Sequence, residues 1–185
     1  MRTPGEVLRF WFSDEAEARW FDSEPSFDAR VTQLFEDTAE TLARGPFPHP
    51  LWEEGPEDAL ALIIALDQFP RNMYRGTRRA YAWDGHALGV SERMVERGDD
   101  MALDADRRKF AYMPYMHAED LAAQERCVDL CREHLEDDGA TLEHAIVHRD
   151  IIARFGRFPH RNDELGRQST EDEVAYLEGG GFNPG

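Results

Sequence analysis

The chain has little cysteine, no long apolar run and little positive charge, and each of these shortages excludes a class of protein. The two cysteines, Cys127 and Cys131, are too few for the disulfide framework of a small secreted protein. No stretch of 18 apolar residues occurs, which excludes a membrane-spanning helix. We therefore expect a soluble protein with reduced cysteines.

Positive charge is also scarce. The 185 residues carry 38 acidic side chains against 21 basic ones, of which only Lys109 is a lysine, and the formal net charge is -17. Nucleic-acid backbones and anionic membranes both require a basic face, so neither is an expected partner. The aromatic stretch Phe10–Phe12 is followed at once by acidic residues, unlike a secretory signal. A cytoplasmic location is the prediction.

The apolar residues recur with the period of an α-helix, and no stretch alternates like a β-strand. Pro56 has the place of a first helical residue, and Gly98 and Gly156 follow the last turns of helices. Ser169 and Thr170 precede acidic residues at the spacing of a capping box. The predicted helices are 4–12, 26–44, 56–68, 84–97, 104–112, 117–137, 140–155 and 170–178. Their short connections predict one all-α domain over residues 1–185, built as an array of antiparallel helix pairs.

Two segments of the chain nearly repeat each other. Residues 68–72 read QFPRN and residues 157–162 read RFPHRN. Each lies in a basic window of an acidic chain: residues 66–81 carry +3, residues 148–168 carry +2, and the remainder carries -22. These windows indicate a polar internal site.

Two hypotheses explain the Phe-Pro turns. In the first they are structural corners, in which proline fixes the turn and the polar side chains satisfy nearby carbonyls. In the second they converge on a small carboxylate or phosphate, which guanidinium groups bind through paired N–H donors. The ligand-binding candidates of the turns are Arg71, Asn72, Arg75, Arg154, Arg157, His160, Arg161 and Asn162.

Helix 56–68 is apolar on nearly all sides, so we expect it at the centre of the fold with Asp67 on its buried surface. A carboxylate in the last turn of a helix opposes the helix dipole and requires compensation. By sequence, Arg71 and Arg75 are the nearest cations to Asp67.

On helix 140–155 the helical period places Arg149 on the face of Leu142, Ile146 and Ala153, and therefore in the core. A buried guanidinium needs a carboxylate. We expect a polar cluster of Arg149 with Asp67, Glu125 or Asp120, and with His117. Such a cluster is either a salt-bridge network that fixes helix packing or the base of a ligand site.

The catalytic candidates are His117, Asp120 and Arg149, because a histidine close to carboxylates can exchange protons. His144 and His148 are four residues apart, as are Cys127 and Cys131, but neither pair has an obvious further ligand. We expect no metal and no cofactor. No nucleophile elbow, phosphate loop or dinucleotide motif occurs, so no reaction follows from the sequence.

Several segments of the sequence, above all residues 66–77, resemble a bacterial family called domain of unknown function 924. Residues 66–77, LDQFPRNMYRGT, are similar to its hallmark. Further matches are residues 7–12, 20–21, 112–120, 148–162 and 165–170, so the resemblance spans nearly the whole chain. It implies a helical fold similar to tetratricopeptide-like arrays and no established activity. Ala118 and Cys127 stand where the family usually has serine.

Two functions are therefore open. The first is a pocket of Arg, His and Asp that binds a small anion, in a role that is either enzymatic or one of binding alone. The second is a tetratricopeptide-like module for a protein partner, in which the same residues form structural salt bridges. An enclosed pocket favours the first function, and the same residues buried as ion pairs favour the second.

Overall fold

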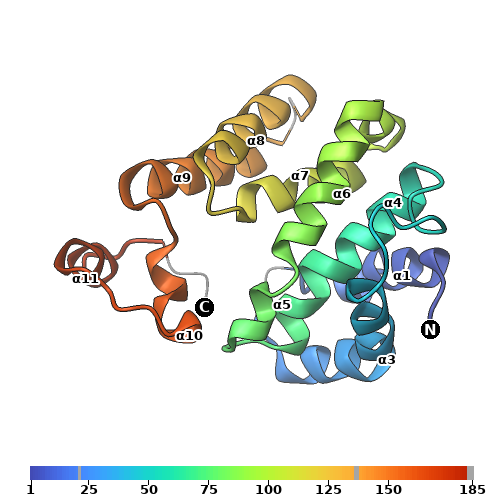
Figure 1. Cartoon of the computed structure of the whole chain (residues 1–185), viewed down its shortest axis with the longest axis horizontal. Coiled ribbons are helices and arrows are strands. Elements are labelled where there is room, and N and C mark those ends of the chain that lie inside the picture. Colours follow the sequence, from blue (N-terminus) through green and yellow to red (C-terminus); the bar gives the residue numbers. More distant parts are fainter. Residues whose placement is uncertain (21, 136–137, 183–185) are drawn as a thin grey trace. The chain divides into compact units, whose positions relative to one another are not determined.

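The computed structural model describes residues 1–20, 22–135 and 138–182, and in these ranges every regular element is a helix (Figure 1). The prediction of an all-α fold is confirmed. Contacts divide the chain into two compact units. Unit 1 comprises Met1–Arg75 and Arg79–Pro114, and unit 2 comprises Gly76–Arg78 and Tyr115–Gly185. The single domain and the tetratricopeptide-like arrangement stay predictions.

Most helices match the predicted ranges to within one residue, and those predicted at 56–68, 104–112 and 117–137 do not. Those of unit 1 are α1 (Pro4–Trp11), α2 (Asp14–Glu17), α3 (Pro25–Ala43), α4 (Pro56–Ile63), η1 (Ile64–Gln68), α5 (Phe69–Met73), α6 (Asp84–Arg97) and η3 (Asp99–Ala102). Two elements have residues in both units, η2 (Arg78–Tyr81) and α7 (Ala105–His117). Those of unit 2 are α8 (Leu121–His134), α9 (Gly139–Phe155), η4 (Pro159–Arg161), α10 (Asn162–Leu165) and α11 (Glu171–Glu178). Phe21 and the predicted helical residues 136–137 lie outside the described ranges.

Unit 1 is built around the helical segment from Pro56 to Met73. Every side chain from Ala59 to Leu66 is fully buried, as the apolar pattern predicted. Helices α1 and α6 pack against α4, and α3 packs against η1 and α5. This central position buries Asp67 as well, with 0% of the residue exposed.

The helix was predicted to end at residue 68, but it continues through Pro70 to Met73. Proline has no N–H, and its ring would clash with the carbonyl four residues earlier, at Leu66. The chain widens into the π-helical segment η1 just before this point, and the Phe69 amide donates to the Ile64 carbonyl five residues back. A π turn of this kind accommodates the proline without ending the helix.

A second proline also lies inside a helix. The sequence predicted one helix over residues 104–112 and the next over 117–137, but α7 runs through Pro114 to His117. Pro114 lies in the last turn of α7, and α8 begins only at Leu121, after the N-cap Asp120. The predicted start of this helix at residue 117 was therefore four residues too early.

Unit 2 consists of the packed pair α8 and α9, followed by the second Phe-Pro turn and α11. A small apolar core of Ile151, Ile152 and Phe158 lies at the end of α9, and Phe155, Tyr176 and Phe182 pack against it. Thr170 and Glu173 form the predicted capping box at the start of α11. The turn is therefore held between α9 and α11.

Candidate functional site

The first Phe-Pro turn of the sequence, which the structure shows to be helical, is an ion-pair junction within unit 1. Arg71 Nη1 lies 3.2 Å from the buried Asp67 carboxylate, so of the two nearest cations in the sequence Arg71 is the one that pairs with it. Its guanidinium also donates two parallel hydrogen bonds of 2.9 Å to Asp84 at the start of α6. Burial alone would lower the pKa of Arg71, but Asp67 and Asp84 raise it above its ordinary value. Arg71 is therefore a permanently charged strut between η1 and α6.

Asn72 and Arg75 share one carboxylate, that of Asp28 on α3. The Asn72 amide donates to it at 2.8 Å, and the Arg75 guanidinium donates at 2.8 and 3.1 Å. The hydrogen bond to Asp28 raises the pKa of Arg75. Both side chains thus tie α5 to α3.

In the second Phe-Pro turn, which belongs to unit 2, Arg157 forms an ion pair with Glu173 that stabilises the fold. It donates at 2.6 and 2.8 Å to the two carboxylate oxygens of Glu173, whose residue is only 2% exposed. Asn162 and the backbone amide of Thr170 donate to the same carboxylate, at 3.2 and 2.7 Å. The bond from Arg157 is the largest cause that lowers the pKa of Glu173, to about 2. Glu173 therefore stays ionised and anchors α11 to the turn.

Glu119, just before α8, holds the turn from its other side. Its carboxylate accepts from Arg167 at 2.6 and 2.9 Å and from the backbone amide of Phe158 at 2.8 Å. Burial alone would raise the pKa of Glu119, but Arg167 and the Phe158 amide lower it. This carboxylate is also ionised.

Arg161 lies between these anchors and is only 5% exposed. Its guanidinium stacks 4.4 Å from the centre of the Phe158 ring, and Nη1 donates to the carbonyl of His117 at 3.1 Å. Stacking on an aromatic face suits the planar guanidinium and leaves its edge, which carries the N–H groups, turned away from the ring.

The buried imidazole of His148 and the half-buried imidazole of His160 stand beside Arg161. The pKa of His148 is lowered to about 3, first by burial and then by the charges of His117 and Arg161. The pKa of His160 is lowered to about 4, first by burial and then by Arg161. Both rings are therefore neutral near pH 7, and each can supply one N–H donor and one acceptor.

The two imidazoles differ in their hydrogen bonds. His148 Nδ1 donates to the His144 carbonyl at 2.7 Å, because a carbonyl only accepts, and its Nε2 is then the acceptor. His160 Nδ1 is buried and has no hydrogen-bond partner within the part of the chain that the structure describes. A buried polar atom in this state indicates a position where a ligand or water binds.

We call the following residues of unit 2 the histidine–arginine cluster: His117, Glu119, His148, His160, Arg161 and Arg167. Within it the charges of Arg161, Glu119, His117 and Arg167 all act on the His160 ring. Guanidinium and imidazole N–H groups can bind an anion, and neutral imidazoles can take up a proton when the anion arrives.

The predicted position of Arg149 was wrong. The buried face of α9 is formed by Ala145, His148, Ile151 and Ile152, so the helix is turned by one residue from the predicted phase. The Arg149 side chain is 32% exposed and pairs with its neighbour Asp150 at 2.6 Å.

The predicted carboxylate partners of Arg149 have other places. Glu125 is exposed on α8. Asp120 caps α8, where its side chain accepts from the Ala123 amide at 2.8 Å. Asp67 belongs to unit 1, where it pairs with Arg71. The predicted polar core cluster is therefore not formed as expected, and of the catalytic candidates only His117 lies in the histidine–arginine cluster.

Two other candidate groups have packing roles. The exposed guanidinium of Arg154 lies over the rings of Phe155 and Tyr176, 4.6 and 5.6 Å from their centres. Cys127 and Cys131 are fully buried on α8, and a hydrogen bond between their thiols is the largest cause that raises the pKa of Cys127. Among the described residues, no three His, Cys, Asp or Glu side chains are placed to hold a metal ion.

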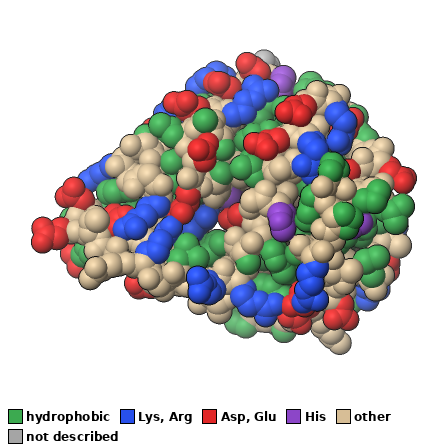
Figure 2. Space-filling view, viewed as in Figure 1, with side chains coloured by type: hydrophobic (Ala, Val, Ile, Leu, Met, Phe, Trp, Pro, Cys, Tyr) green, Lys and Arg blue, Asp and Glu red, His purple; other side chains and the backbone are tan. Residues whose placement is uncertain are grey.

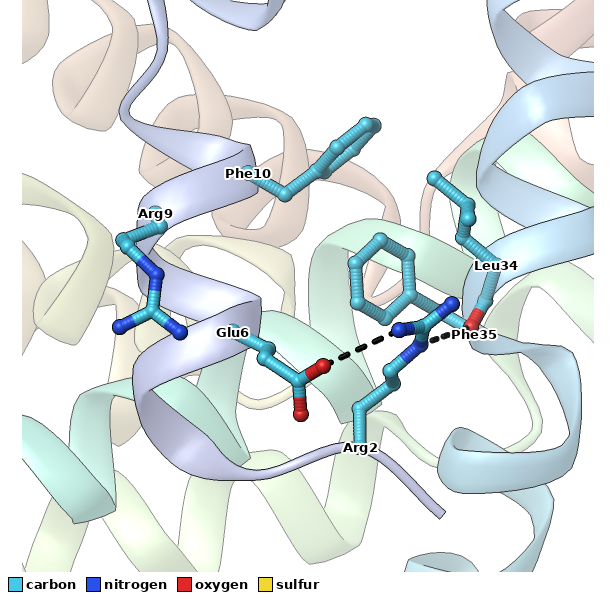
Figure 3. A pocket seen from close by; sticks show the side chains of 6 residues that line it. All are labelled: Arg2, Glu6, Arg9, Phe10, Leu34 and Phe35. Carbon is cyan, nitrogen blue, oxygen red and sulfur yellow. Dashed lines mark hydrogen bonds and ion pairs between the residues drawn. The ribbon is translucent and has the colours of Figure 1, made fainter.

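Unit 1 has a small hollow between α1 and α3 (Figure 3). Its volume is about 190 Å³, below the roughly 300 Å³ at which ligand pockets typically begin. Arg2 crosses it, donating to Glu6 at 3.0 Å and to the Leu34 carbonyl at 3.3 Å. These contacts tie the N-terminus to α3, and the hollow is too small for a substrate-sized molecule.

Basic side chains do not gather into one patch on the face seen in Figure 2, where they stand in small groups beside acidic ones. This agrees with the carboxylate partners of Arg71, Arg75 and Arg157. No helix among the described residues has the length and apolar character needed to cross a membrane.

Comparisons with known proteins find one family and one similar solved structure. The model of a bacterial protein family of unknown function, DUF924, matches residues 7–181. The solved structure of the protein of unknown function ATU0120 from Agrobacterium tumefaciens superimposes with a TM-score of 0.87 and 43% sequence identity. The match covers 95% of this chain and 97% of the other. No curated protein matches the chain by sequence.

Proposed function

The chain belongs to the bacterial DUF924 family of unknown function, and from this premise we propose that its histidine–arginine cluster binds a small anion, a carboxylate or a phosphate. The observation that carries the proposal is the buried His160 Nδ1, which has no hydrogen-bond partner among the described residues and lies in the field of Arg161. An anion in contact with both groups would accept a hydrogen bond from this nitrogen and be attracted by the Arg161 guanidinium.

Proton uptake is part of this proposal. A bound anion favours the charged form of a neighbouring imidazole and so raises its pKa. By linkage, protonation of His148 or His160 strengthens anion binding as the pH falls. The same imidazoles are the groups through which an enzymatic role would act, with His117 as the remaining catalytic candidate.

The first Phe-Pro turn has a different role in the proposal. Arg71, Asn72 and Arg75 are engaged by carboxylates of unit 1, and we assign them to fold stability. Arg157 and Asn162, which donate hydrogen bonds to the Glu173 carboxylate, are also assigned to fold stability. These ion pairs favour the structural hypothesis for most of the predicted ligand-binding residues, so the anion site is reduced to the cluster around Arg161.

The alternative, a module that binds a protein partner, remains the second candidate. It is favoured by the same ion pairs, because a rigid helical scaffold with struts is what such a module needs. A cytoplasmic location stays a prediction.

A thermal-shift screen of carboxylates and phosphates tests the anion site. A molecule that binds only the folded protein raises the Tm as its concentration exceeds the Kd. We expect such a rise for the wild-type protein and its loss in Arg161→Gln. Arg154→Gln is the matched control, since it removes the same charge from an exposed side chain that stacks on Phe155 and Tyr176.

Two results contradict the anion site. One is a panel in which no carboxylate or phosphate shifts the Tm of the wild-type protein. The other is a ligand whose shift survives in a folded Arg161→Gln variant. Either result leaves the protein-binding module as the better candidate.

A further inference from the structure

The end of the described chain folds back on unit 2. Residues 179–182, which we call the strap, follow α11 and place Phe182 against two rings of the histidine–arginine cluster. The centre of the Phe182 ring is 4.5 Å from that of His148 and 5.7 Å from that of His160. Both ring pairs have edge-to-face geometry, a favourable arrangement for aromatic groups. The strap therefore covers part of the cluster.

Backbone hydrogen bonds hold the strap to α11. The amides of Gly179, Gly180 and Gly181 donate to the carbonyls of Ala175, Leu177 and Tyr176 at 3.0, 3.2 and 2.9 Å. The Phe182 amide donates to the Tyr176 hydroxyl oxygen at 3.0 Å. Tyr176 thus holds both Gly181 and Phe182.

The folded-back path requires glycine at two positions. Gly180 has φ of 82°, a left-handed conformation that side chains disfavour. A Cβ at Gly181 would lie 2.5 Å from a ring carbon of Tyr176 and 2.6 Å from its carbonyl oxygen. Because the second contact is with backbone, no side-chain rotation relieves it, and any larger residue at Gly181 would push the strap out of place.

The strap is also easy to open. It is tied down by a few hydrogen bonds and one half-buried ring, whereas the cluster beneath it is held by bidentate ion pairs of Arg157 and Arg167. Three successive glycines gain more conformational freedom on release than other residues would. Segments with few buried contacts open locally at a small fraction of the cost of global unfolding.

We propose that the strap is a gate on the anion site: with Phe182 on His148 and His160 the site is closed, and release of residues 179–182 opens it. This inference rests on the proposed function, because it names what controls access to that same site. Phe182 packs against the imidazole rings that an anion would have to reach, so strap closure and anion binding compete. The apparent affinity is then lowered by the fraction of molecules that are closed.

Calorimetric titration with inorganic phosphate tests the gate. Gly181→Ala displaces the strap through the Tyr176 clash and keeps Phe182, while Phe182→Ala removes the ring and keeps the backbone. If the strap is open about a tenth of the time, both variants should bind phosphate about tenfold more tightly than the wild type. Gly139→Ala is the control, because a Cβ at this exposed first residue of α9 meets nothing within 4 Å.

The outcomes separate the gate from the site. Equal phosphate affinity in the wild type, Gly181→Ala and Phe182→Ala overturns the gate and leaves the proposed function standing. If phosphate binds to no folded variant and no carboxylate or phosphate of the thermal-shift panel binds either, both the gate and the proposed function are overturned. Tighter binding in Gly181→Ala and Phe182→Ala, with Gly139→Ala unchanged, supports the gate and the anion site together.

Discussion

Arg71 and Arg161 each precede an asparagine in their Phe-Pro turns, yet their surroundings differ. Arg71 reaches two carboxylates, one of them fully buried. Arg161 stacks on Phe158 and meets neutral imidazoles. The same local sequence therefore gives a strut in one place and a candidate ligand group in the other, because residues far along the chain supply the partners.

Loss of Arg71 should be costly. Arg71→Ala leaves Asp67 buried without its guanidinium, and breaking a buried pair in this way typically destabilises a protein by about 3 kcal/mol or more. Arg75→Ala, which removes a more exposed pair with Asp28, should cost about 1 kcal/mol or less. Urea denaturation measures both free energies of unfolding. Equal losses in the two variants would contradict the strut role of Arg71.

The buried histidines should make stability depend on pH. In the folded state the pKa values of His148 and His160 are lowered to about 3 and 4, against roughly 6.5 in the unfolded chain. The unfolded state therefore binds more protons below pH 6.5, and the stability present above that pH is lost as the pH falls toward the folded values.

Between pH 6.5 and 5, His148 alone should remove about 2 kcal/mol from the free energy of unfolding. Carboxylates with a lowered pKa, such as Glu173, act mainly below this range. Urea denaturation of the ligand-free protein at several pH values provides the measurement, and His148→Gln should flatten the slope. The same slope in wild type and variant would show that His148 is not buried in its neutral form.

At the scale of elements, Glu173 joins α11 to the second turn. Glu173→Gln weakens the bonds to Arg157, Asn162 and the Thr170 amide at once, so it should lower the Tm by several degrees. Glu171→Gln is the control, an exposed acid in the same first turn of α11. Thermal unfolding followed by circular dichroism compares the two. Similar small shifts for both would refute the anchoring role.

Helix boundaries were largely predictable because their signals are local. Thr170 with Glu173, Gly98 and Gly156 each act within one turn of the residue they cap. Prolines inside helices were the failures, since a proline ordinarily ends a helix, and a π turn that accommodates Pro70 has no sequence signal of its own.

The phase of α9 could not be predicted for a physical reason. Leu142, Ile146 and Ala153 offer one apolar face, and Ala145, Ile151 and Ile152 offer another, so the sequence supports two orientations. Packing against α8 and the second turn decides between them and buries His148 in place of Arg149. The period of a single helix contains no information about its partner.

At the scale of the whole molecule, the candidate site lies within one unit and depends on hydrogen bonds between residues that are far apart in the sequence. Glu119 and Arg167 are 48 residues apart, and Glu119 and Phe158 are 39 apart. The excess of arginine in the second basic window indicated a site there, and the predicted Arg161 and His160 are part of it. Glu119, Arg167 and Phe182 were not among the predicted site residues, because only the folded chain brings them together with Arg161 and His160.

An acidic molecule with a net charge of -17 repels anions at long range, so an anion site must rely on close, buried groups. Arg161 and the neutral imidazoles meet this requirement. Partly desolvated groups are also screened less by salt than exposed ones. Anion affinity should therefore fall by less than about threefold between 50 and 200 mM sodium chloride, as measured by titration at constant pH. A steep loss would indicate binding to an exposed surface.

The central claim is that the histidine–arginine cluster binds an anion with proton uptake. Calorimetric titration with sulfate, a tetrahedral oxyanion like phosphate, tests it most directly. The charge of sulfate does not change between pH 7.5 and 6, so a pH-dependent Kd reports the protons that the imidazoles take up on binding. The account predicts a Kd that falls as the pH is lowered, and no binding to Arg161→Gln. Binding that is absent in the wild type, or that is unchanged by pH and by Arg161→Gln, would contradict it.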